Sequence, residues 1–368
     1  MEIKGKQFRT LAILLSISLA VLLIVVLFHK DEENQSLSYA DKISRVLGIE
    51  TSIEKQVKQI QLKKLSEANL YLTDRPNPVQ KIQMEGKLDT DPAKKQTVKS
   101  LEDLKKLYLF SYSYKLSQNQ KYLTKASEFI LAWAKTYKAS GNSVDETHLE
   151  QLFEGYAWVR ANMATVDVNI VDTWLKTIAE KEMLVKYKDD RDINNWNSHR
   201  INIVGQIGYI TFDKKYTDYA LDAYKKQIQN NLYSDGSSMD YVTRDALHYH
   251  AFDLWALLNF ARTASLHGVD LYNYQSASGA SLKKSVHFLY PYINGTKTHA
   301  EFIKSQATWD VVTGSKNKAA TWNPNEGLYI MELAYYFDDT ALPLIQKIKN
   351  NKVEFPSFET YLSYSLRN

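Results

Sequence analysis

Two segments of the sequence collect side chains that can do chemistry without a metal. Residues 194–199 read Asn-Asn-Trp-Asn-Ser-His and stand at the start of an apolar helical pattern. Asparagine is a favoured helix N-cap, so capping alone explains either Asn194 or Asn195. The other amide, together with His199, would present neutral donors at the positive end of a helix. The segment is therefore compatible with a simple cap and with an anion-binding site.

The second segment opens a predicted continuous helix, Asp240–Leu266. At about 100° per residue, Arg244, His248 and Tyr249 share one face of this helix, and aromatic side chains follow on the same side. Aromatic rings beside Arg and His are typical of a lined cleft. His250 falls on the opposite, apolar side, where we expect a hydrogen-bonded core histidine.

These residue types fit β-elimination in an acidic polysaccharide. The proton beside a uronate carboxylate is hard to remove until the carboxylate charge is offset. Asn195 and His199 would hydrogen-bond that carboxylate and stabilise the enediolate that develops in the transition state. Tyr249 or His199 would take the C-5 proton, and Tyr249 would return a proton to the leaving glycosidic oxygen. Arg244 would lower the pKa of Tyr249 by its opposite charge and help to hold the substrate.

Two other functions stay open from the residues alone. Glycoside hydrolysis needs two carboxylates that face each other across the scissile bond. Candidate carboxylates are Glu85, Glu146, Glu154, Asp235 and Asp245. The other alternative is a catalytically silent glycan-binding protein in surface polysaccharide assembly, which would keep the cleft without turnover.

Composition and the absence of known motifs argue against metal, cofactor and nucleic-acid binding. The sequence has no cysteine, no Gly-x-Ser-x-Gly elbow, no phosphate-binding glycine loop and no His-Glu-x-x-His helix. We therefore expect neither a metal nor a cofactor. A formal net charge of +4 over 368 residues is too small to indicate a nucleic-acid binder.

The elements that must position these residues are predicted to be helices. Only 13 glycines and 7 prolines occur, which is few for a fold built from strands and turns. Helical spacing recurs along the chain, whereas no segment alternates apolar and polar residues convincingly. Ser100–Leu116, with Ser100 as its predicted cap, and Asn119–Lys138 form a predicted antiparallel hairpin. A series of such hairpins must close on itself or stack in a line to bury every apolar face. Of these two arrangements we predict the closed one, a mainly α fold that forms an (α/α) toroid with a central cleft.

The amino-terminal residues predict a membrane anchor. Residues 11–28 are uncharged, mostly aliphatic and numerous enough to span a bilayer. Basic residues precede this segment and mainly acidic ones follow it, which places residues 1–10 in the cytoplasm. No small-x-small cleavage site follows, so an uncleaved signal anchor is favoured. We predict a single-pass protein of the cell membrane, with a stalk at 29–50 and the toroid, residues 51–368, on the extracytoplasmic side. Its predicted partner there is machinery for surface polysaccharide synthesis or export.

Six short motifs resemble those of the alginate lyase superfamily of polysaccharide lyases, over about residues 70–336. They read Met-Glu-Gly-Lys-Leu-Asp-Thr-Asp-Pro from Met84, Leu-Ala-Trp-Ala-Lys-Thr-Tyr from Leu131, Gly-Asn-Ser-Val-Asp-Glu-Thr-His from Gly141, Asn-Asn-Trp-Asn-Ser-His from Asn194, Ala-Leu-His-Tyr-His from Ala246 and Thr-Trp-Asn-Pro from Thr321. The resemblance implies an (α/α) toroid and β-elimination of a uronate polymer, with Tyr249 as the catalytic tyrosine.

The sequence departs from the pattern of this superfamily at two places. In the superfamily the paired asparagines are followed directly by a catalytic histidine, where this chain has Trp196. The superfamily's arginine also lies farther upstream of the tyrosine than Arg244 does. The departures leave the polymer unassigned, and Trp196 is the best support for a silent binding protein.

Six residues are candidates for substrate binding. They are Asn194, Trp196, His248, Glu146, His148 and Trp322. Glu146 and His148 follow the Gly-Asn-Ser loop and would border the cleft, although a glutamate at a helix start needs no further role. Trp322 would stack on a sugar ring, or it would pack in the core as such residues more often do.

Overall fold

The computed structural model describes residues 51–187, 189–307, 310 and 319–367. The chain divides into two compact units, 1–59 and 60–368, and every residue of the candidate site lies in the second unit. The predicted cytoplasmic residues 1–10, the membrane span 11–28 and the stalk 29–50 lie outside the described residues. Within the described part of the chain, no helix is both long and apolar enough to cross a membrane.

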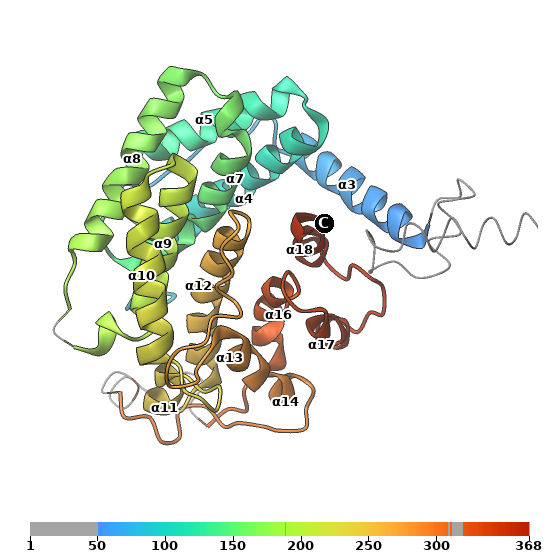
Figure 1. The fold of residues 1–368 in the computed structure, drawn as a ribbon. Helices are drawn as coiled ribbons and strands as arrows, with labels where there is room; N and C mark the ends of the chain where they lie inside the picture. The colour runs from blue at the N-terminus through green and yellow to red at the C-terminus, as the bar shows by residue number, and fades with distance from the viewer. Residues whose placement is uncertain (1–50, 188, 308–309, 311–318, 368) are drawn as a thin grey trace, which may run out of the picture. The chain divides into compact units, whose positions relative to one another are not determined.

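The described residues fold into helices joined by loops (Figure 1). The helices, numbered as in Figure 1, are α3 (Ser52–Leu70), α4 (Pro92–Ser117), α5 (Gln120–Thr136), α6 (Ser143–Glu146), α7 (Glu150–Val159), α8 (Thr165–Leu184), α9 (Asn195–Thr211), α10 (Lys214–Asn231), α11 (Met239–Arg244), α12 (Leu247–Ser265), α13 (Leu282–Phe288), α14 (Tyr290–Ile293), α16 (Leu328–Ala334), α17 (Leu342–Ile348) and α18 (Phe358–Arg367). Among the described residues, strand-like pairing is limited to two isolated bridges, Leu232 with Ser238 and Ala300 with Thr321. The prediction of a mainly helical fold is confirmed for this part of the chain.

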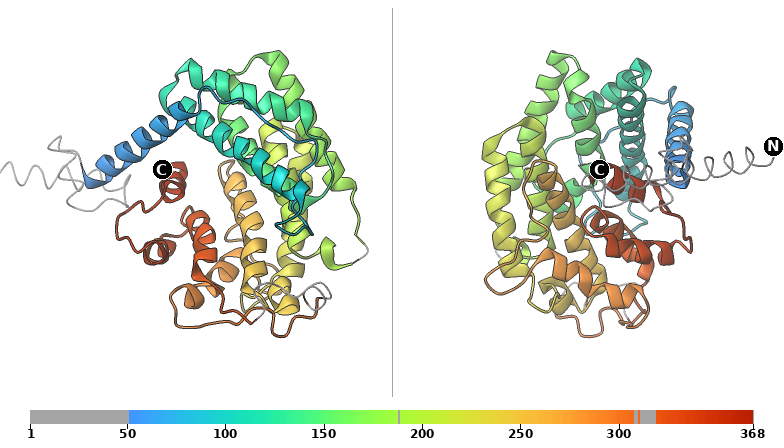
Figure 2. Two further views of the ribbon diagram at one scale, coloured as in Figure 1. Left: turned by 180° about the vertical axis from the view of Figure 1, so that it is seen from behind. Right: turned by 45° about the vertical axis from the view of Figure 1, so that its right-hand side comes forward.

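Helix α9 is the element around which the candidate site is built. It makes its most extensive contacts with α10 and α12, and α8 also packs against it (Figures 1 and 2). Ile203, Val204 and Ile207 of α9 join a core formed with α4, α5, α7 and α8. Ile201 of α9 joins a second core, formed with α10, α12, α13 and α16. Because α9 lies between two cores, most of its residues are buried, the polar ones included.

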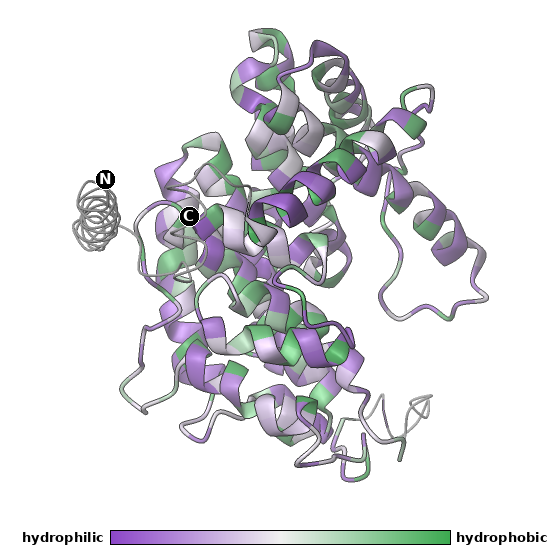
Figure 3. Ribbon diagram, turned by 90° about the vertical axis from the view of Figure 1, so that its right-hand side faces the viewer, coloured by the Kyte–Doolittle hydropathy of each residue, from purple (hydrophilic) through white to green (hydrophobic). Residues whose placement is uncertain are grey.

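Outer helices are amphipathic, with hydrophilic and hydrophobic residues interleaved along the ribbons (Figure 3). On α5 the side chains of Phe129, Ile130 and Trp133 are fully buried, while Lys125 and Glu128 form a partly exposed ion pair. Helices α4 and α5 pack against each other as the predicted hairpin.

Helix α4 begins earlier than the sequence predicts. It starts at Pro92, and Asp91 caps it by accepting hydrogen bonds from the backbone N–H groups of Ala93 and Lys94. Ser100, the predicted cap, is buried inside the helix. The Asp-Pro pair is the stronger start signal because proline lacks the N–H that the first turn of a helix leaves unpaired.

The predicted continuous helix Asp240–Leu266 is broken in two, so that prediction is wrong. Helix α11 ends at Arg244 and α12 begins at Leu247. Between them Asp245 adopts a left-handed backbone conformation with φ of 49°, which a helix cannot accommodate. The direction of Arg244 relative to α12 is therefore set by this break and not by helical spacing.

A distant carboxylate stabilises the start of α12 at the break. Glu301 accepts hydrogen bonds from the backbone N–H groups of Leu247 (2.8 Å) and His248 (3.2 Å). These groups belong to the first turn of α12, where backbone donors have no partner within the helix. The negative charge also complements the positive end of the helix dipole.

Candidate active site

The start of α9 binds a carboxylate of the protein itself. Asn194 caps the helix and accepts a hydrogen bond from the backbone N–H of Trp196 (3.0 Å). Asn195 donates from its backbone N–H to Asp240 (2.8 Å) and from its side-chain amide to the other oxygen of the same carboxylate. Asn195 and Asp240 are both buried. At the helix start where the sequence predicts an anion site, the bound anion is Asp240.

Arg244 and Tyr249 lie on either side of the break and stack on each other. Cζ of Arg244 is 3.3 Å from the centroid of the Tyr249 ring. Arg244 also forms a two-point ion pair with the buried Asp310, in which Nε lies 2.9 Å from one carboxylate oxygen and Nη2 bonds to the other. The guanidinium is thus fixed over the phenol by cation–π attraction and by a bidentate salt bridge.

We call Asn195, Asp240, Arg244, Tyr249 and Asp310 the tyrosine cluster. Burial raises the pKa of Asp240 to about 6, although the hydrogen bonds from Asn195 oppose this. Burial also raises the pKa of Tyr249 above its ordinary value, and the positive charge of Arg244 opposes that rise. The phenol is therefore neutral at neutral pH, and Arg244 offsets part of the free energy needed to ionise it.

His199 faces a different neighbourhood from Asn195, although both are on α9. Its Nδ1 lies 2.8 Å from Oγ1 of Thr147, and its ring packs on Phe252 and Trp255 with centroids 4.2 and 5.4 Å away. Nε2 is buried without a hydrogen-bond partner among the described residues. Burial lowers the pKa of His199 to about 3, so the ring is neutral at physiological pH. The described contacts do not join His199 directly to the tyrosine cluster.

Trp196 and His248 point to other partners. The Trp196 ring lies 5.5 Å from the ring of Tyr187 and 5.4 Å from the guanidinium carbon of Arg191. His248 is exposed, with Nδ1 2.8 Å from a carboxylate oxygen of Glu326. Substrate binding by these two residues stays a prediction.

Glu146 and Trp322 are both buried. Glu146 accepts hydrogen bonds from the Tyr137 hydroxyl (3.1 Å) and from the backbone N–H (2.6 Å) and hydroxyl (3.0 Å) of Ser140. These bonds anchor the loop before α6. Trp322 is only 4% exposed and belongs to the core around α12 and α16, which leaves little of its ring open to a sugar.

His250 is a hydrogen-bonded core histidine, as predicted. Its Nδ1 lies 2.8 Å from the Ser238 hydroxyl and its Nε2 3.1 Å from the backbone carbonyl of Ser285. Both ring nitrogens therefore have hydrogen-bond partners within the protein.

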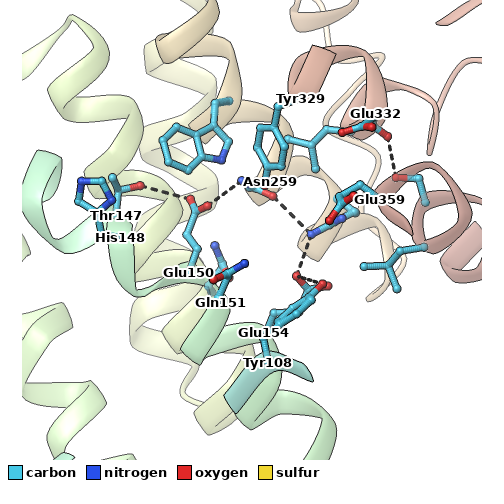
Figure 4. A pocket seen from close by; sticks show the side chains of 16 residues that line it. Tyr108, Thr147, His148, Glu150, Gln151, Glu154, Asn259, Tyr329, Glu332 and Glu359 are labelled. Atoms are coloured by element: carbon cyan, nitrogen blue, oxygen red, sulfur yellow. Dashed lines mark hydrogen bonds and ion pairs between the residues drawn. The ribbon is translucent and has the colours of Figure 1, made fainter. Parts of the chain in front are cut away.

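A second polar region is a cavity of about 240 Å³, and only His148 and Glu154 of its lining are among the candidates from the sequence. Its wall carries four carboxylates and one guanidinium, from Glu150, Glu154, Glu332, Glu359 and Arg262 (Figure 4). Tyr108, Trp255 and Tyr329 add aromatic surface, and Thr147 and the candidate His148 complete one side. We call this site the acidic cavity.

The carboxylates of the acidic cavity are held in different ways. Glu150 accepts hydrogen bonds from the side-chain amides of Asn202 and Asn259 (3.0 Å for Asn259). Glu154 accepts from the Tyr108 hydroxyl (3.3 Å) and pairs with Arg262 (3.2 Å), both through Oε2. Burial raises the pKa of Glu150 to about 8, so this carboxyl is mostly protonated at neutral pH.

Two further groups of the acidic cavity titrate away from their ordinary range. Burial raises the pKa of Glu332 to about 7, against a hydrogen bond from Ser357. Burial lowers the pKa of His148, so its imidazole adds no positive charge at neutral pH. In the described part of the chain, no group of three or more His, Asp or Glu side chains is arranged to hold a metal ion.

The acidic cavity adjoins His199. Thr147 and Trp255 both line it, and these are the residues that His199 contacts. In the sequence, the only signals of the cavity are the spacings of Glu150 to Glu154 and of Asn259 to Arg262, one turn of a helix each. Such spacings are common on solvated helix faces, so they do not show that α7 and α12 face each other.

A model of the alginate lyase family matches residues 50–299, well over half of the chain. This chain belongs to the alginate lyase family. The resemblance inferred from the six motifs is thereby confirmed. No curated protein matches the chain.

Solved structures show that this alginate lyase family member has a fold similar to those of other alginate lyases. An alginate lyase from Bacteroides ovatus is 17% identical with a TM-score of 0.61, and the match covers 83% of this chain and 93% of that one. Alginate lyase A1-III from Sphingomonas species A1 is 20% identical with a TM-score of 0.54, over 75% of this chain and 88% of that one. A variant of alginate lyase A1-III complexed with a tetrasaccharide is 20% identical with a TM-score of 0.57, over 77% and 87% of the two chains.

The similarity in fold is consistent with the predicted helical toroid. Together with family membership, it supports polysaccharide lyase activity.

Proposed function

We propose that this chain cleaves a uronate-containing polysaccharide by β-elimination, with Tyr249 as the proton carrier. The observation that carries the proposal is the stacking of Arg244 on Tyr249, 3.3 Å from ring centroid to Cζ. In a member of the alginate lyase family, this gives the tyrosine of the Ala-Leu-His-Tyr-His motif a fixed cation.

The reaction requires one proton to be taken and one to be given. Tyr249, ionised with the help of Arg244, would accept the C-5 proton of the uronate. The electron pair of that C–H bond would form the C4–C5 double bond as the C4–O bond breaks. The protonated phenol would then give its proton to the leaving glycosidic oxygen, which completes the shuttle.

The uronate carboxylate needs a donor during this step. Arg244 uses Nε and Nη2 for Asp310, which leaves Nη1 available for the substrate. Asn195 already binds Asp240 through its backbone N–H and its side-chain amide, so only its second amide hydrogen can be donated to the uronate carboxylate. His199 is fully buried between Thr147 and Trp255, and we assign it a positioning role.

The test measures ultraviolet absorbance of unsaturated uronate released by the full-length chain from a panel of uronate polymers. Tyr249→Phe should lower the rate by about 10²–10⁴-fold, the range expected for a lost proton-transfer group. Tyr233→Phe, an exposed tyrosine outside the cluster, is the matched control. Circular dichroism confirms that each variant folds. Undiminished absorbance from folded Tyr249→Phe would overturn the assignment.

The pH profile tests the same proposal in another way. Because the pKa of Tyr249 is raised by burial, the ionised form is a minor species at neutral pH. The rate should therefore increase about tenfold per pH unit on the alkaline side of neutrality until the phenol is ionised. A rate that falls over that range would contradict tyrosine as the base.

One observation favours glycoside hydrolysis as a second candidate. In the acidic cavity Glu150, with its pKa raised to about 8, lies near Glu154, which pairs with Arg262. A protonated and an ionised carboxyl in one site are typical of glycosidases. Product mass separates the two reactions, since hydrolysis adds a water molecule and elimination does not.

A further inference from the structure

We propose that the acidic cavity is a subsite for an amino sugar with a free, protonated amine, adjacent to the uronate in the substrate polymer. The inference deepens the proposed function and rests on it. It predicts that the substrate is a copolymer of uronate and amino sugar and not a polymer of uronate alone.

Charge is the first argument. The cavity wall presents the carboxyl groups of Glu150, Glu154, Glu332 and Glu359 against the single guanidinium of Arg262 (Figure 4). Glu150 is mostly protonated and Glu332 partly protonated at neutral pH, so the other two carboxyls and the ionised fraction of Glu332 supply the negative charge. His148 does not compensate, because burial lowers its pKa. A uronate carboxylate in this space would face several acidic groups at short range, whereas an ammonium group would be attracted by them.

The atoms left available are the second argument. Tyr108 and Arg262 both bond to Oε2 of Glu154, which leaves Oε1 open to a ligand. Ser357 donates a hydrogen bond to Oε1 of the buried Glu332, which leaves Oε2 of Glu332 open to a ligand as well. An ammonium group has three hydrogens to donate and no acceptor, so it matches such oxygens.

The aromatic walls are the third argument. The rings of Trp255 and Tyr329 lie nearly perpendicular, at 87° with centroids 5.7 Å apart, and both border the cavity. The indole N–H of Trp255 is buried without an acceptor among the described residues. A sugar ring supplies what this N–H lacks, because its hydroxyl and ring oxygens accept hydrogen bonds while its C–H face packs on aromatic rings. A bare metal ion would supply no acceptor.

Position is the fourth argument. Thr147 and Trp255 line the cavity and also contact His199, with Thr147 Oγ1 2.8 Å from His199 Nδ1. His199 is on the same helix as Asn195, which holds the tyrosine cluster at its start. The cavity thus lies next to the elements that carry the proposed reaction, as a neighbouring sugar subsite should.

The test compares two forms of one ligand, a tetrasaccharide of alternating glucuronate and glucosamine, with free amines or with N-acetylated amines. Binding to full-length Tyr249→Phe is measured by calorimetry, so that turnover does not interfere. The free-amine form should bind about tenfold more tightly, as expected for one charge-assisted contact. Equal binding, or tighter binding of the acetylated form, would overturn the subsite.

Variants then locate the effect. Glu154→Gln and Glu359→Gln, each added to Tyr249→Phe, should bring the affinity ratio of the two forms close to one. Glu359 is exposed at the rim, so its variant is informative even if loss of Glu154 disturbs Arg262. Glu128→Gln on the outer helix α5 is the control and should leave the ratio unchanged. A ratio that persists in both cavity variants would place the amine elsewhere and refute the inference.

The two proposals fail in distinguishable ways. If the wild-type chain releases unsaturated uronate without preferring the free-amine form, the subsite is wrong and the elimination stands. If the amine preference is present and sensitive to Glu154→Gln while no polymer yields unsaturated product, the subsite stands and the elimination is wrong.

Discussion

The tyrosine cluster and the acidic cavity differ in how their charges are balanced. In the cluster a carboxylate of the protein holds each donor side chain, with Asp240 bound to Asn195 and Asp310 bound to Arg244. In the cavity several carboxyl groups face one guanidinium. Burial raises the pKa values of Glu150 and Glu332, so part of the negative charge that these groups would carry is neutralised by bound protons. The first arrangement fixes the position of side chains before a substrate arrives, as a reaction centre requires. The second leaves charge for a ligand to neutralise, as a binding subsite requires.

The largest effect expected from this difference is at Arg244. Arg244→Lys keeps the positive charge but loses the flat stacking on Tyr249 and the two-point pair with Asp310. We expect the rate of unsaturated product release to fall about a hundredfold, within the range for a lost transition-state contact. The ratio of the affinities for the free-amine and N-acetylated tetrasaccharides should be unchanged, because the amine is proposed to bind in the acidic cavity.

A matched control exists elsewhere in the same unit. Arg160 also pairs with a carboxylate through two nitrogens, on Asp172, and lies 5.0 Å from the centroid of the Phe212 ring. Arg160→Lys should leave the rate as it is. Equal losses in Arg160→Lys and Arg244→Lys would mean that the rate reports fold stability and not the cluster.

A smaller effect is expected where the cluster depends on backbone geometry. Glu301→Ala removes the acceptor for the first N–H groups of α12, just before Tyr249. We expect the free energy of unfolding to fall by about 2 kcal/mol, as for hydrogen bonds to a charged group. Urea denaturation measures this change, and the rate of elimination should fall with it.

The control for Glu301→Ala is an ordinary helix cap. Asn119 caps α5 in an exposed position, and Asn119→Ala should lower the free energy of unfolding by only about 1 kcal/mol. If both variants lose the same amount, Glu301 is no more than a cap, and other contacts hold the break between α11 and α12.

The contrast between the two regions also explains what the sequence could and could not predict. Helical periodicity was sufficient for the fold class, because apolar spacing depends only on neighbours along the chain. The segments carrying Asn195 and Tyr249 were recognisable because each is a compact run of functional residue types. The break at Asp245 was missed because the carboxylate that caps α12, Glu301, lies far away in the sequence.

The acidic cavity was missed for a related reason. Its lining comes from α4, α7, α9, α12, α16, α18 and the short 3-10 helix before α7, and each contributes only one to three polar residues. On any single helix, Glu154 or Glu332 is indistinguishable from a surface glutamate. Only the packing of distant helices shows that these side chains share a buried space.

The pH dependence of the free energy of unfolding tests the protonation of Glu332 in the acidic cavity. The pKa of Glu332 rises from 4.5 to about 7 on folding, so the folded state binds more protons than the unfolded state between these values. The contribution of Glu332 to stability is therefore present below pH 4.5 and is lost as the pH rises to about 7.

Glu332→Gln should remove this dependence. The variant should nearly match the wild type at pH 4.5 and exceed its free energy of unfolding by about 2 kcal/mol at pH 6, measured by urea denaturation. Glu128→Gln, on the partly exposed ion pair of α5, should not change the pH dependence. A variant that is less stable than the wild type at both pH values would show that the Glu332 charge is compensated and that the cavity is not poised for a cation.

The smallest expected effect concerns the link between the two regions. Thr147→Val removes the hydroxyl that bonds to His199 and to Glu150 (3.3 Å) while keeping the volume of the side chain. We expect a loss of about 1 kcal/mol in the free energy of unfolding, the usual effect of one buried hydrogen bond. Thr124→Val, whose exposed hydroxyl bonds within α5, should change it far less.

A double-mutant cycle of Thr147→Val with His199→Gln shows whether this bond connects the cavity to α9. If it does, the two effects on affinity for the free-amine tetrasaccharide should depart from additivity by at least about 0.5 kcal/mol. Additive effects would mean that His199 only fills space between the regions, and that the tyrosine cluster and the acidic cavity act independently.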